Sequence, residues 1–194
     1  MKITDLANIK KLYFSAKDIA DAFAISYDSA KVTCSRYASK GLIIRVKRNL
    51  YVSRNKWSNI PERDMFVITN MLQVPSYISL TTALVYYGVT TQVQRNFIES
   101  VSVRKTKRFD VEDVVFNFSK IKKQYFNYFL RKDNIFIATP EKALVDAIYL
   151  TAFNMYKLDF KAIEYKKLDF KKIRNILKQY PDRVKKLCDK ICKI

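Results

Sequence analysis

The sequence contains no histidine among its 194 residues and only two glycines, Gly41 and Gly88. Without histidine there can be no Ser-His-Asp triad, no Cys-His pair and no histidine general base. Two isolated glycines cannot form a glycine-rich phosphate loop or a dinucleotide-binding fingerprint. Most familiar enzyme classes are therefore excluded, and we expect neither catalytic residues nor a cofactor.

Cysteine is also scarce, with only Cys34, Cys188 and Cys192 in the chain. An odd count without an even framework argues against a secreted disulfide scaffold. Cys188 and Cys192 lie one helical turn apart, but no histidine or third nearby cysteine completes a zinc site. We therefore expect reduced thiols and no bound metal.

Long apolar runs are absent, since no segment approaches the ~18 residues needed to span a bilayer. The beginning of the chain, "MKITDLANIKK", is charged too early and too evenly for a signal peptide. Hydrophobic residues nevertheless make up 49% of the sequence, which is enough for a core. These features predict a folded cytoplasmic protein without a membrane partner.

Acidic residues are few relative to basic ones: 18 against 37, a formal net charge of +19. Residues 1–56 hold 12 basic and 4 acidic residues, residues 57–156 hold 12 and 9, and residues 157–194 hold 13 and 5. A lysine-rich composition typical of an A/T-rich genome explains many lysines, but it does not explain the missing acidic residues. Such an excess attracts polyanions, so we expect contact with nucleic acid.

The polar segment "RNKWSNIPERD", residues 54–64, breaks the preceding pattern and predicts a domain boundary. We therefore predict a DNA-binding domain over residues 1–56 and a second domain over residues 57–194. Near the end of the chain, "KLDFKAI" at Lys157 is repeated as "KLDFKKI" at Lys167. Two copies are too few for a solenoid, and we interpret them as two similar strand or helix starts.

Two short helices are predicted in the first domain. Ser15 precedes a helical run and has Asp18 three residues later, a variant of the capping box. Ser26 can cap a second helix, which Gly41 ends in the left-handed conformation. The second helix should face the core with Ala30, Cys34 and Tyr37. Two helices joined by a tight turn indicate a helix-turn-helix.

A basic β-hairpin is predicted to follow in "LIIRVKRNLYV". Its inward residues should be Leu42, Ile44 and Val46, and its turn Lys47 to Asn49, because Asn tolerates positive φ. A hairpin after a recognition helix is typical of a winged helix. The expected groove contacts on the second helix are Tyr27, Ser29, Lys31, Thr33 and Arg36, and the expected phosphate contacts on the hairpin are Arg45, Lys47 and Arg48. The alternative is that Arg45, Lys47 and Arg48 only keep an exposed hairpin hydrated and contact no nucleic acid.

The sequence of residues 57–194 predicts a mixed α/β domain, so we expect the chain to belong to the α+β fold class. "PERDMFVITNMLQV" is helical, and "SYISLTTALVYYG" passes from an extended piece into a helix ended by Gly88. "NFIESVSV" and "DVVFNFSKI" read as strands. In "NIFIATPEKALVDAIYL", residues 135–138 form a strand, Thr139 caps a helix and Pro140 takes its first position. The segment "DFKKIRNILKQYPDRVKKLCDKICKI" predicts two basic amphipathic helices that are separated at Pro181.

The second domain could instead be catalytic, since a metal nuclease requires clustered carboxylates. Glu141 precedes Lys142 in a first helical turn, where its charge suits the helix dipole, and Asp146 lies on another face. A metal-dependent nucleic-acid-processing enzyme is therefore the less favoured alternative. Its candidate carboxylates are Glu99, Asp110, Glu112, Asp113, Glu141 and Asp146.

Over most of its length the chain resembles the AbiEi family of antitoxins and transcriptional regulators from type IV toxin–antitoxin systems. The segments that carry the resemblance are "FSAKDIADAFAISYDSAKVTCSRYASKGLIIRVKRNLY", "PSYISLTTALVYYGV" and "IFIATPEKALVDAIYL". Members typically have a glycine just before the Leu-Tyr of the wing, where this chain has Asn49. That departure is conformationally mild.

The resemblance implies a winged helix that binds inverted repeats in operator DNA and represses its own operon. It also implies a C-terminal domain that counters a cognate nucleotidyltransferase-like toxin, without a stable complex between the two proteins. A stand-alone winged-helix regulator without a toxin is the alternative within the same class, and the neighbouring gene distinguishes the two.

Overall fold

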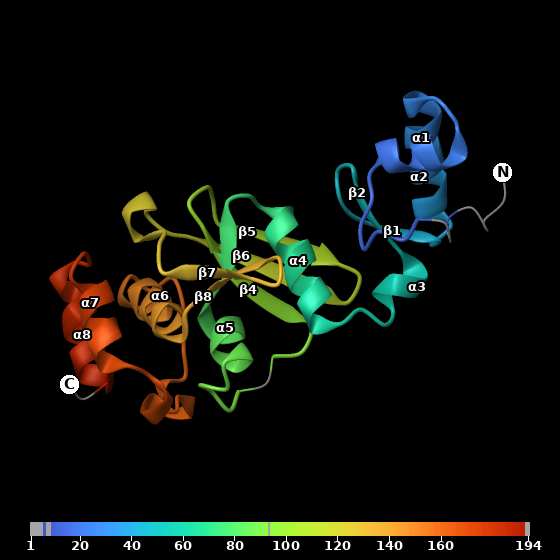
Figure 1. Cartoon of the computed structure of the whole chain (residues 1–194). Helices are drawn as coiled ribbons and strands as arrows, with labels where there is room; N and C mark the ends of the chain where they lie inside the picture. Colours follow the sequence, from blue (N-terminus) through green and yellow to red (C-terminus); the bar gives the residue numbers. More distant parts are fainter. Residues whose placement is uncertain (1–5, 7–8, 93, 193–194) are drawn as a thin grey trace. The chain divides into compact units, whose positions relative to one another are not determined.

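The structure is a computed structural model that describes residue 6, residues 9–92 and residues 94–192 (Figure 1). Most of the opening segment that we compared with a signal peptide lies outside the described residues. The chain divides into two compact units, residues 1–68 and residues 69–194, and each is described by itself. The sequence-based boundary after residue 56 precedes this division, which lies within a helix.

The N-terminal unit contains two helices, a two-stranded hairpin, a one-turn helix and the start of a longer helix. Its elements are α1 (Ala16–Phe23), α2 (Tyr27–Ser39), β1 (Ile43–Lys47), β2 (Leu50–Ser53), α3 (Arg54–Trp57) and α4 (Glu62–Leu72). A buried apolar cluster joins α1, α2 and the hairpin, and it consists of Ile9, Phe14, Ala16, Ile19, Ala20, Ala30, Cys34, Tyr37, Ile43 and Tyr51.

The predicted caps of α1 and α2 are confirmed. Ser15 and Asp18 form a reciprocal capping box at the start of α1. Ser26 caps α2 by accepting a hydrogen bond from the backbone N–H of Ser29 at 3.2 Å. Gly41 follows α2 with φ +70°, a left-handed conformation that glycine adopts without a steric penalty. Local sequence therefore sets where both helices begin and where α2 ends.

The hairpin is one residue tighter than the sequence predicted. Lys47 is the last residue of β1 and pairs with Leu50, so the turn consists of Arg48 and Asn49 rather than beginning at Lys47. Asn49 has φ +58°, as the turn prediction requires. A register shift between Arg45 and Lys47 adds a residue to β1, which is why counting simple alternation placed Lys47 in the turn.

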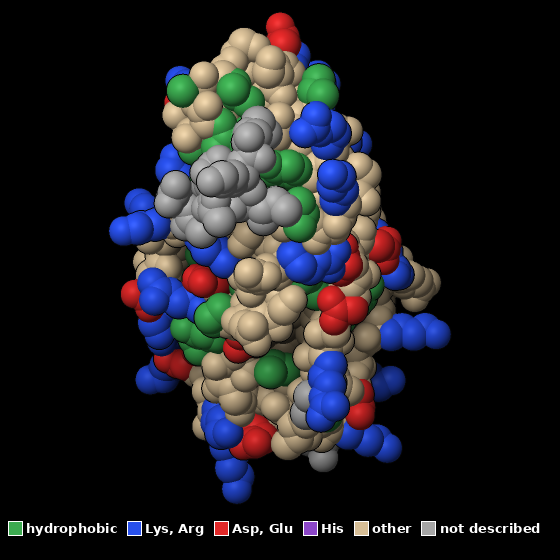
Figure 2. Space-filling model, turned by 90° about the vertical axis from the view of Figure 1, so that its right-hand side faces the viewer, with side chains coloured by type: hydrophobic (Ala, Val, Ile, Leu, Met, Phe, Trp, Pro, Cys, Tyr) green, Lys and Arg blue, Asp and Glu red, His purple; other side chains and the backbone are tan. Residues whose placement is uncertain are grey.

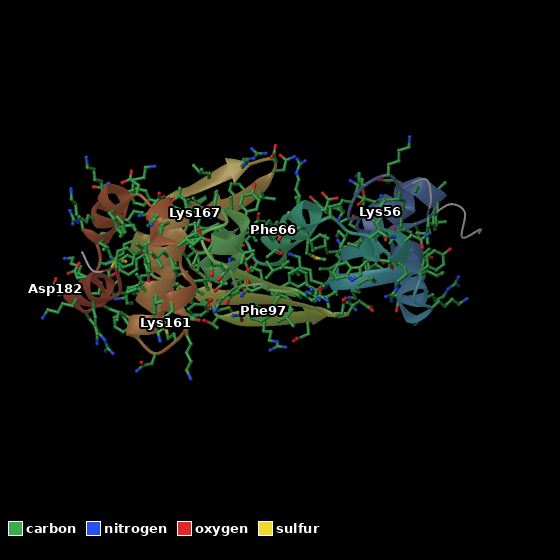
Figure 3. All side chains as sticks on the ribbon, turned by 90° about the horizontal axis from the view of Figure 1, so that it is seen from below. Lys56, Phe66, Phe97, Lys161, Lys167 and Asp182 are labelled. Carbon is green, nitrogen blue, oxygen red and sulfur yellow. The ribbon has the colours of Figure 1, made fainter. Side chains whose placement is uncertain are left out.

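The one-turn helix α3 lies in the segment that the sequence identified only as a polar boundary. Ser53 caps it, accepting a hydrogen bond from the backbone N–H of Lys56. The Lys56 ammonium (Figure 3) donates to the carbonyl oxygens of Ile9, Lys10 and Lys11 at 3.1, 2.8 and 2.6 Å. This lysine therefore holds the segment before α1 against α3.

A six-stranded mixed sheet forms the centre of the C-terminal unit. Its strand order is β5-β6-β4-β3-β8-β7, with parallel pairs β4/β6 and β3/β8 and the other neighbours antiparallel. The strands are β3 (Ser76–Ile78), β4 (Phe97–Ser102), β5 (Lys107–Val111), β6 (Val114–Lys120), β7 (Phe129–Lys132) and β8 (Ile135–Ala138). The sequence predicted β3, β4, β6 and β8, but it missed the two edge strands, β5 and β7.

Among its described residues, this unit also contains the end of α4, four further helices and 3₁₀ turns over residues 123–125, 160–162 and 165–167. The helices are α5 (Leu80–Tyr86), α6 (Pro140–Ala152), α7 (Phe170–Leu177) and α8 (Asp182–Cys192). Helix α6 packs against α5, and α7 and α8 pack against α6 (Figure 1). Thr139 caps α6 with Pro140 in its first turn, as predicted.

The repeated "KLDF" segments each begin a helical turn, which confirms one of the two readings left open for them. Asp159 caps the first turn through the backbone N–H of Lys161, and Asp169 caps α7 through those of Lys171 and Lys172. Pro181 separates α7 from α8 as expected, and Asp182 opens α8 (Figure 3). Among the described residues, no helix is both long enough and apolar enough to cross a membrane.

Candidate nucleic-acid interface

Helix α2 presents most of the predicted contact residues to solvent. Tyr27 is 48% exposed, and the Lys31 ammonium lies over its ring, 5.1 Å from the centroid. Lys31 also pairs with Asp28, with 2.6 Å between Nζ and Oδ1. That hydrogen bond raises the pKa of Lys31 and lowers the pKa of Asp28, so both side chains are charged near neutral pH. The exposed start of α2 therefore carries the charged Lys31 side chain, which lies between the Asp28 carboxylate and the Tyr27 ring.

A groove of about 390 Å³ separates α2 from the hairpin. The α2 wall uses positions spaced by three or four residues, and the hairpin wall uses the turn and its two strands. The lining residues are Tyr27, Lys31, Ser35 and Ala38 from α2, and Arg45, Arg48, Asn49 and Tyr51 from the hairpin. Four predicted contacts thus meet in one groove: Tyr27, Lys31, Arg45 and Arg48. Three cations and several hydroxyls in one concave surface match the donors that contact phosphate and sugar.

Thr33 corrects the sequence-based choice of the contact face. We predicted it on the solvent side of α2, but it is only 5% exposed. Thr33 lies three residues after Ala30 and four before Tyr37, so it shares the buried side of the helix with them. The hydroxyl of Thr33 suggested an exposed position. The buried side of α2 in fact includes Thr33 in addition to Ala30, Cys34 and Tyr37, the apolar residues that the sequence placed there.

The other predicted contacts lie outside the groove lining. Ser29 and Arg36 are exposed on α2, and the Ser29 hydroxyl accepts a hydrogen bond from the Ser26 hydroxyl at 2.9 Å. Lys47 is only half-exposed at the end of β1. Sequence reasoning missed Ser35, Ala38, Asn49 and Tyr51 as groove residues. The helical spacing of Tyr27, Lys31, Ser35 and Ala38 was the signal that could have identified the α2 wall.

The face of the molecule drawn in Figure 2 is rich in cations. Lys and Arg side chains are spread widely over the face in Figure 2, and Asp and Glu side chains are fewer there. The charge excess is already present in residues 1–56, with 12 basic and 4 acidic residues. Because field strength sums over these charges, residues 1–56 carry a positive field, whose sign is the one that attracts polyanions.

The candidate carboxylates of the C-terminal unit fall into two groups that differ in burial. Asp110, Glu112 and Asp113 are exposed on or between β5 and β6, and Arg108 pairs with Asp110. Glu99, Glu141 and Asp146 are buried. In the part of the chain that the structure describes, no cluster of three or more His, Cys, Asp or Glu side chains could hold a metal ion.

Glu99 is enclosed in a hydrogen-bond network that the sequence did not indicate. Its Oε2 accepts from the Tyr156 hydroxyl at 2.8 Å, from Gln94 at 2.9 Å and from the backbone N–H of Thr81 at 3.2 Å. Burial raises the pKa of Glu99, and these hydrogen bonds oppose the rise. The same surroundings raise the pKa of Tyr156. The network joins β4 to the start of α5 and to the segment after α6.

The two C-terminal cysteines lie close together, as their spacing predicted. Cys188 is buried and Cys192 is half-buried on α8, and their sulfur atoms are 3.7 Å apart. Both are free thiols in the structure.

No protein-family model matches the chain, and no curated protein matches it. Among solved structures, it is similar to the crystal structure of the RV2827C protein from Mycobacterium tuberculosis. The two share 10% sequence identity with a TM-score of 0.64, over 98% of this chain and 74% of that chain. At this identity the likeness shows the fold alone: a mixed α/β protein.

Proposed function

We propose that the N-terminal residues 1–56 form a winged helix-turn-helix domain that binds double-stranded operator DNA. In this arrangement α2 enters the major groove and the β1–β2 hairpin contacts the adjacent backbone. The groove that gathers Lys31, Arg45 and Arg48 between α2 and the hairpin is the observation that carries the proposal. Exposed cations on both walls suit phosphates, which fix orientation without reading sequence.

We propose further that the chain is a type IV antitoxin that represses its own operon and counters a nucleotidyltransferase-like toxin. The support is the resemblance of its sequence to the AbiEi family, together with the charge of the N-terminal unit. Inverted repeats in the operator match two copies of the domain on one duplex. The C-terminal unit has its own sheet and its own core, and this supports a separate function for it.

Binding is tested with the purified full-length chain and a duplex covering the DNA upstream of its own reading frame. We expect binding that weakens steeply with salt, because cations on the protein displace counterions from the phosphates. Replacing Arg45 and Arg48 by Gln should lower the slope of log K against log salt by about one unit per lost phosphate contact. Arg95→Gln, an exposed arginine of the C-terminal unit, is the matched control.

Co-expression with the neighbouring reading frame tests the antitoxin role. A gene that arrests growth alone and is tolerated together with this chain supports it. DNA binding without such a neighbour would favour the stand-alone regulator. A chain that binds no duplex at any salt concentration, and whose arginine variants behave like Arg95→Gln, would contradict the DNA-binding proposal itself.

A further inference from the structure

Val32 occupies the middle of the exposed face of α2. It is 59% exposed, the highest value for any large hydrophobic side chain among the described residues. The buried side of the helix carries Ala30 and Cys34, each two residues from Val32. At about 100° per residue, Val32 points roughly 200° away from both of them. It therefore faces away from the core of its unit.

The local fold supplies no reason for a valine at this position. A β-branched residue in a helix interior is a weaker helix former than alanine, because its side chain loses rotamer freedom. Because the Val32 side chain stays largely in contact with water, it contributes little hydrophobic stabilisation to the folded unit. The neighbouring exposed residues of α2, among them Asp28, Ser35, Arg36 and Ser39, are polar. Single exposed apolar side chains are common on proteins, but this one lies in the centre of the polar helix face that the proposed function places in the major groove.

We infer that Val32 contacts the C5 methyl group of a thymine in the major groove, and so specifies an A·T pair by apolar contact. The inference rests on the proposed DNA-binding function. In the major groove, thymine alone among the four standard bases presents a methyl group. Valine has no hydrogen-bonding side-chain atom, so it can distinguish bases only by such a contact. Lys31 precedes Val32 directly and Arg36 lies one helical turn after it, and both supply charge for the backbone.

This chemistry separates Val32 from the groove contacts described above. Lys31, Arg45 and Arg48 would bind any sequence, whereas a methyl contact depends on the base. Removing a methyl group from such a contact changes affinity by about fourfold, because one buried methylene contributes about 0.8 kcal/mol. Val32 is therefore a specificity-determining residue with a modest and measurable effect.

The experiment compares thymine with uracil, which pairs identically and lacks only the methyl group. A duplex is selected from a random pool by the wild-type protein and then synthesised again with deoxyuridine at every thymidine. We expect the wild-type protein to bind the uracil duplex about fourfold more weakly per contact. Val32→Ala should bind the thymine duplex with the same loss and should not distinguish the two duplexes.

Val74→Ala is the matched control, since Val74 is also an exposed valine, at 55%, and lies in the C-terminal unit. It should retain the full preference for thymine. Equal binding of both duplexes by the wild type, or an undiminished preference in Val32→Ala, would overturn the inference while leaving DNA binding intact. Failure of the wild type to select any duplex would overturn the inference and the proposed function together. Thermal melting of Val32→Ala verifies that the variant is folded.

Discussion

Lys142 and Asp146 form an ion pair inside the C-terminal unit, one turn apart on α6, and neither side chain is exposed to solvent. Asp146 also accepts hydrogen bonds from the hydroxyls of Tyr77 and Ser79, each at 2.9 Å. The Lys142 ammonium donates to the hydroxyl of Tyr180 at 2.8 Å. Burial raises the pKa of Asp146 and lowers that of Lys142, and the attraction between the two charges opposes both shifts. The pair connects β3, α6 and the segment between α7 and α8.

Replacing Lys142 by Met should destabilise the protein strongly, because it leaves the Asp146 carboxylate buried without a counter-charge. Breaking one side of a buried pair costs about 3–5 kcal/mol. The double variant Lys142→Met/Asp146→Leu should be less destabilised than the single variant, since no buried charge is left unpaired. Urea unfolding measures both, with Lys190→Met, an exposed lysine of α8, as the control. An unchanged midpoint for Lys142→Met would contradict the network.

Asp18 should make the stability of the N-terminal unit depend on pH. Burial raises the pKa of Asp18, but hydrogen bonds from Lys11 and from the side chain and backbone of Ser15 outweigh it and hold the pKa at about 2, below the ordinary 3.8. A depressed pKa gives stability that is present above pH 3.8 and is lost as the pH falls toward about 2. The contribution is at most about 2 kcal/mol.

Asp18→Asn is the variant that tests this pH dependence, because it retains the shape of the side chain without the charge. Its unfolding free energy should fall below that of the wild type at neutral pH, and the gap should close between pH 3.8 and about 2. Urea unfolding, followed at a series of pH values, measures the gap. A gap of constant size across this range would show that the charge of Asp18 is not the source of the stability.

Asn70 should stabilise the sheet beside β3. Its amide accepts from the backbone N–H of Phe136 at 2.7 Å and donates to the carbonyl oxygen of the same residue at 3.3 Å. Asn70→Ala leaves both backbone groups of β8 without these partners, at a cost of about 1–3 kcal/mol. Hydrogen exchange at the Phe136 amide should accelerate in the variant. Unchanged exchange there would mean that the backbone amide finds another partner.

Lys31→Ala combined with Arg36→Ala should weaken DNA binding and leave thermal stability nearly unchanged. Both side chains are exposed on α2, and surface substitutions away from caps and cores rarely change stability much. Binding is measured against the upstream duplex, and the melting temperature by circular dichroism. Thr33→Arg is the contrasting variant, since a charged side chain at this buried position should unfold the unit. A large drop in melting temperature for the double alanine variant would place these side chains in the core.

Short-range signals predicted a large part of the fold. Ser15 with Asp18, Thr139 with Pro140, and Asn49 each depend on hydrogen bonds or dihedral angles within a few residues, so the local sequence was sufficient. The edge strands β5 and β7 were missed because they lack a long apolar run and are stabilised by pairing with strands elsewhere in the sheet. The predicted contact residues of α2 are exposed except for Thr33, whose burial depends on what packs against the helix.

The sequence by itself determined the charge excess, the lack of histidine chemistry, the starts of α1 and α2 and the end of α2, because composition and capping are local properties. Only the tertiary structure decided the strand order and the groove between α2 and the hairpin. It also decided the place of Lys142, whose position beside Glu141 in a first helical turn gave no sign of burial. A lysine becomes a core residue only when distant parts of the chain supply its partners. Here Tyr180, which follows α7, accepts a hydrogen bond from Lys142. Tyr77 in β3 and Ser79 directly after β3 donate hydrogen bonds to Asp146, the counter-charge of Lys142.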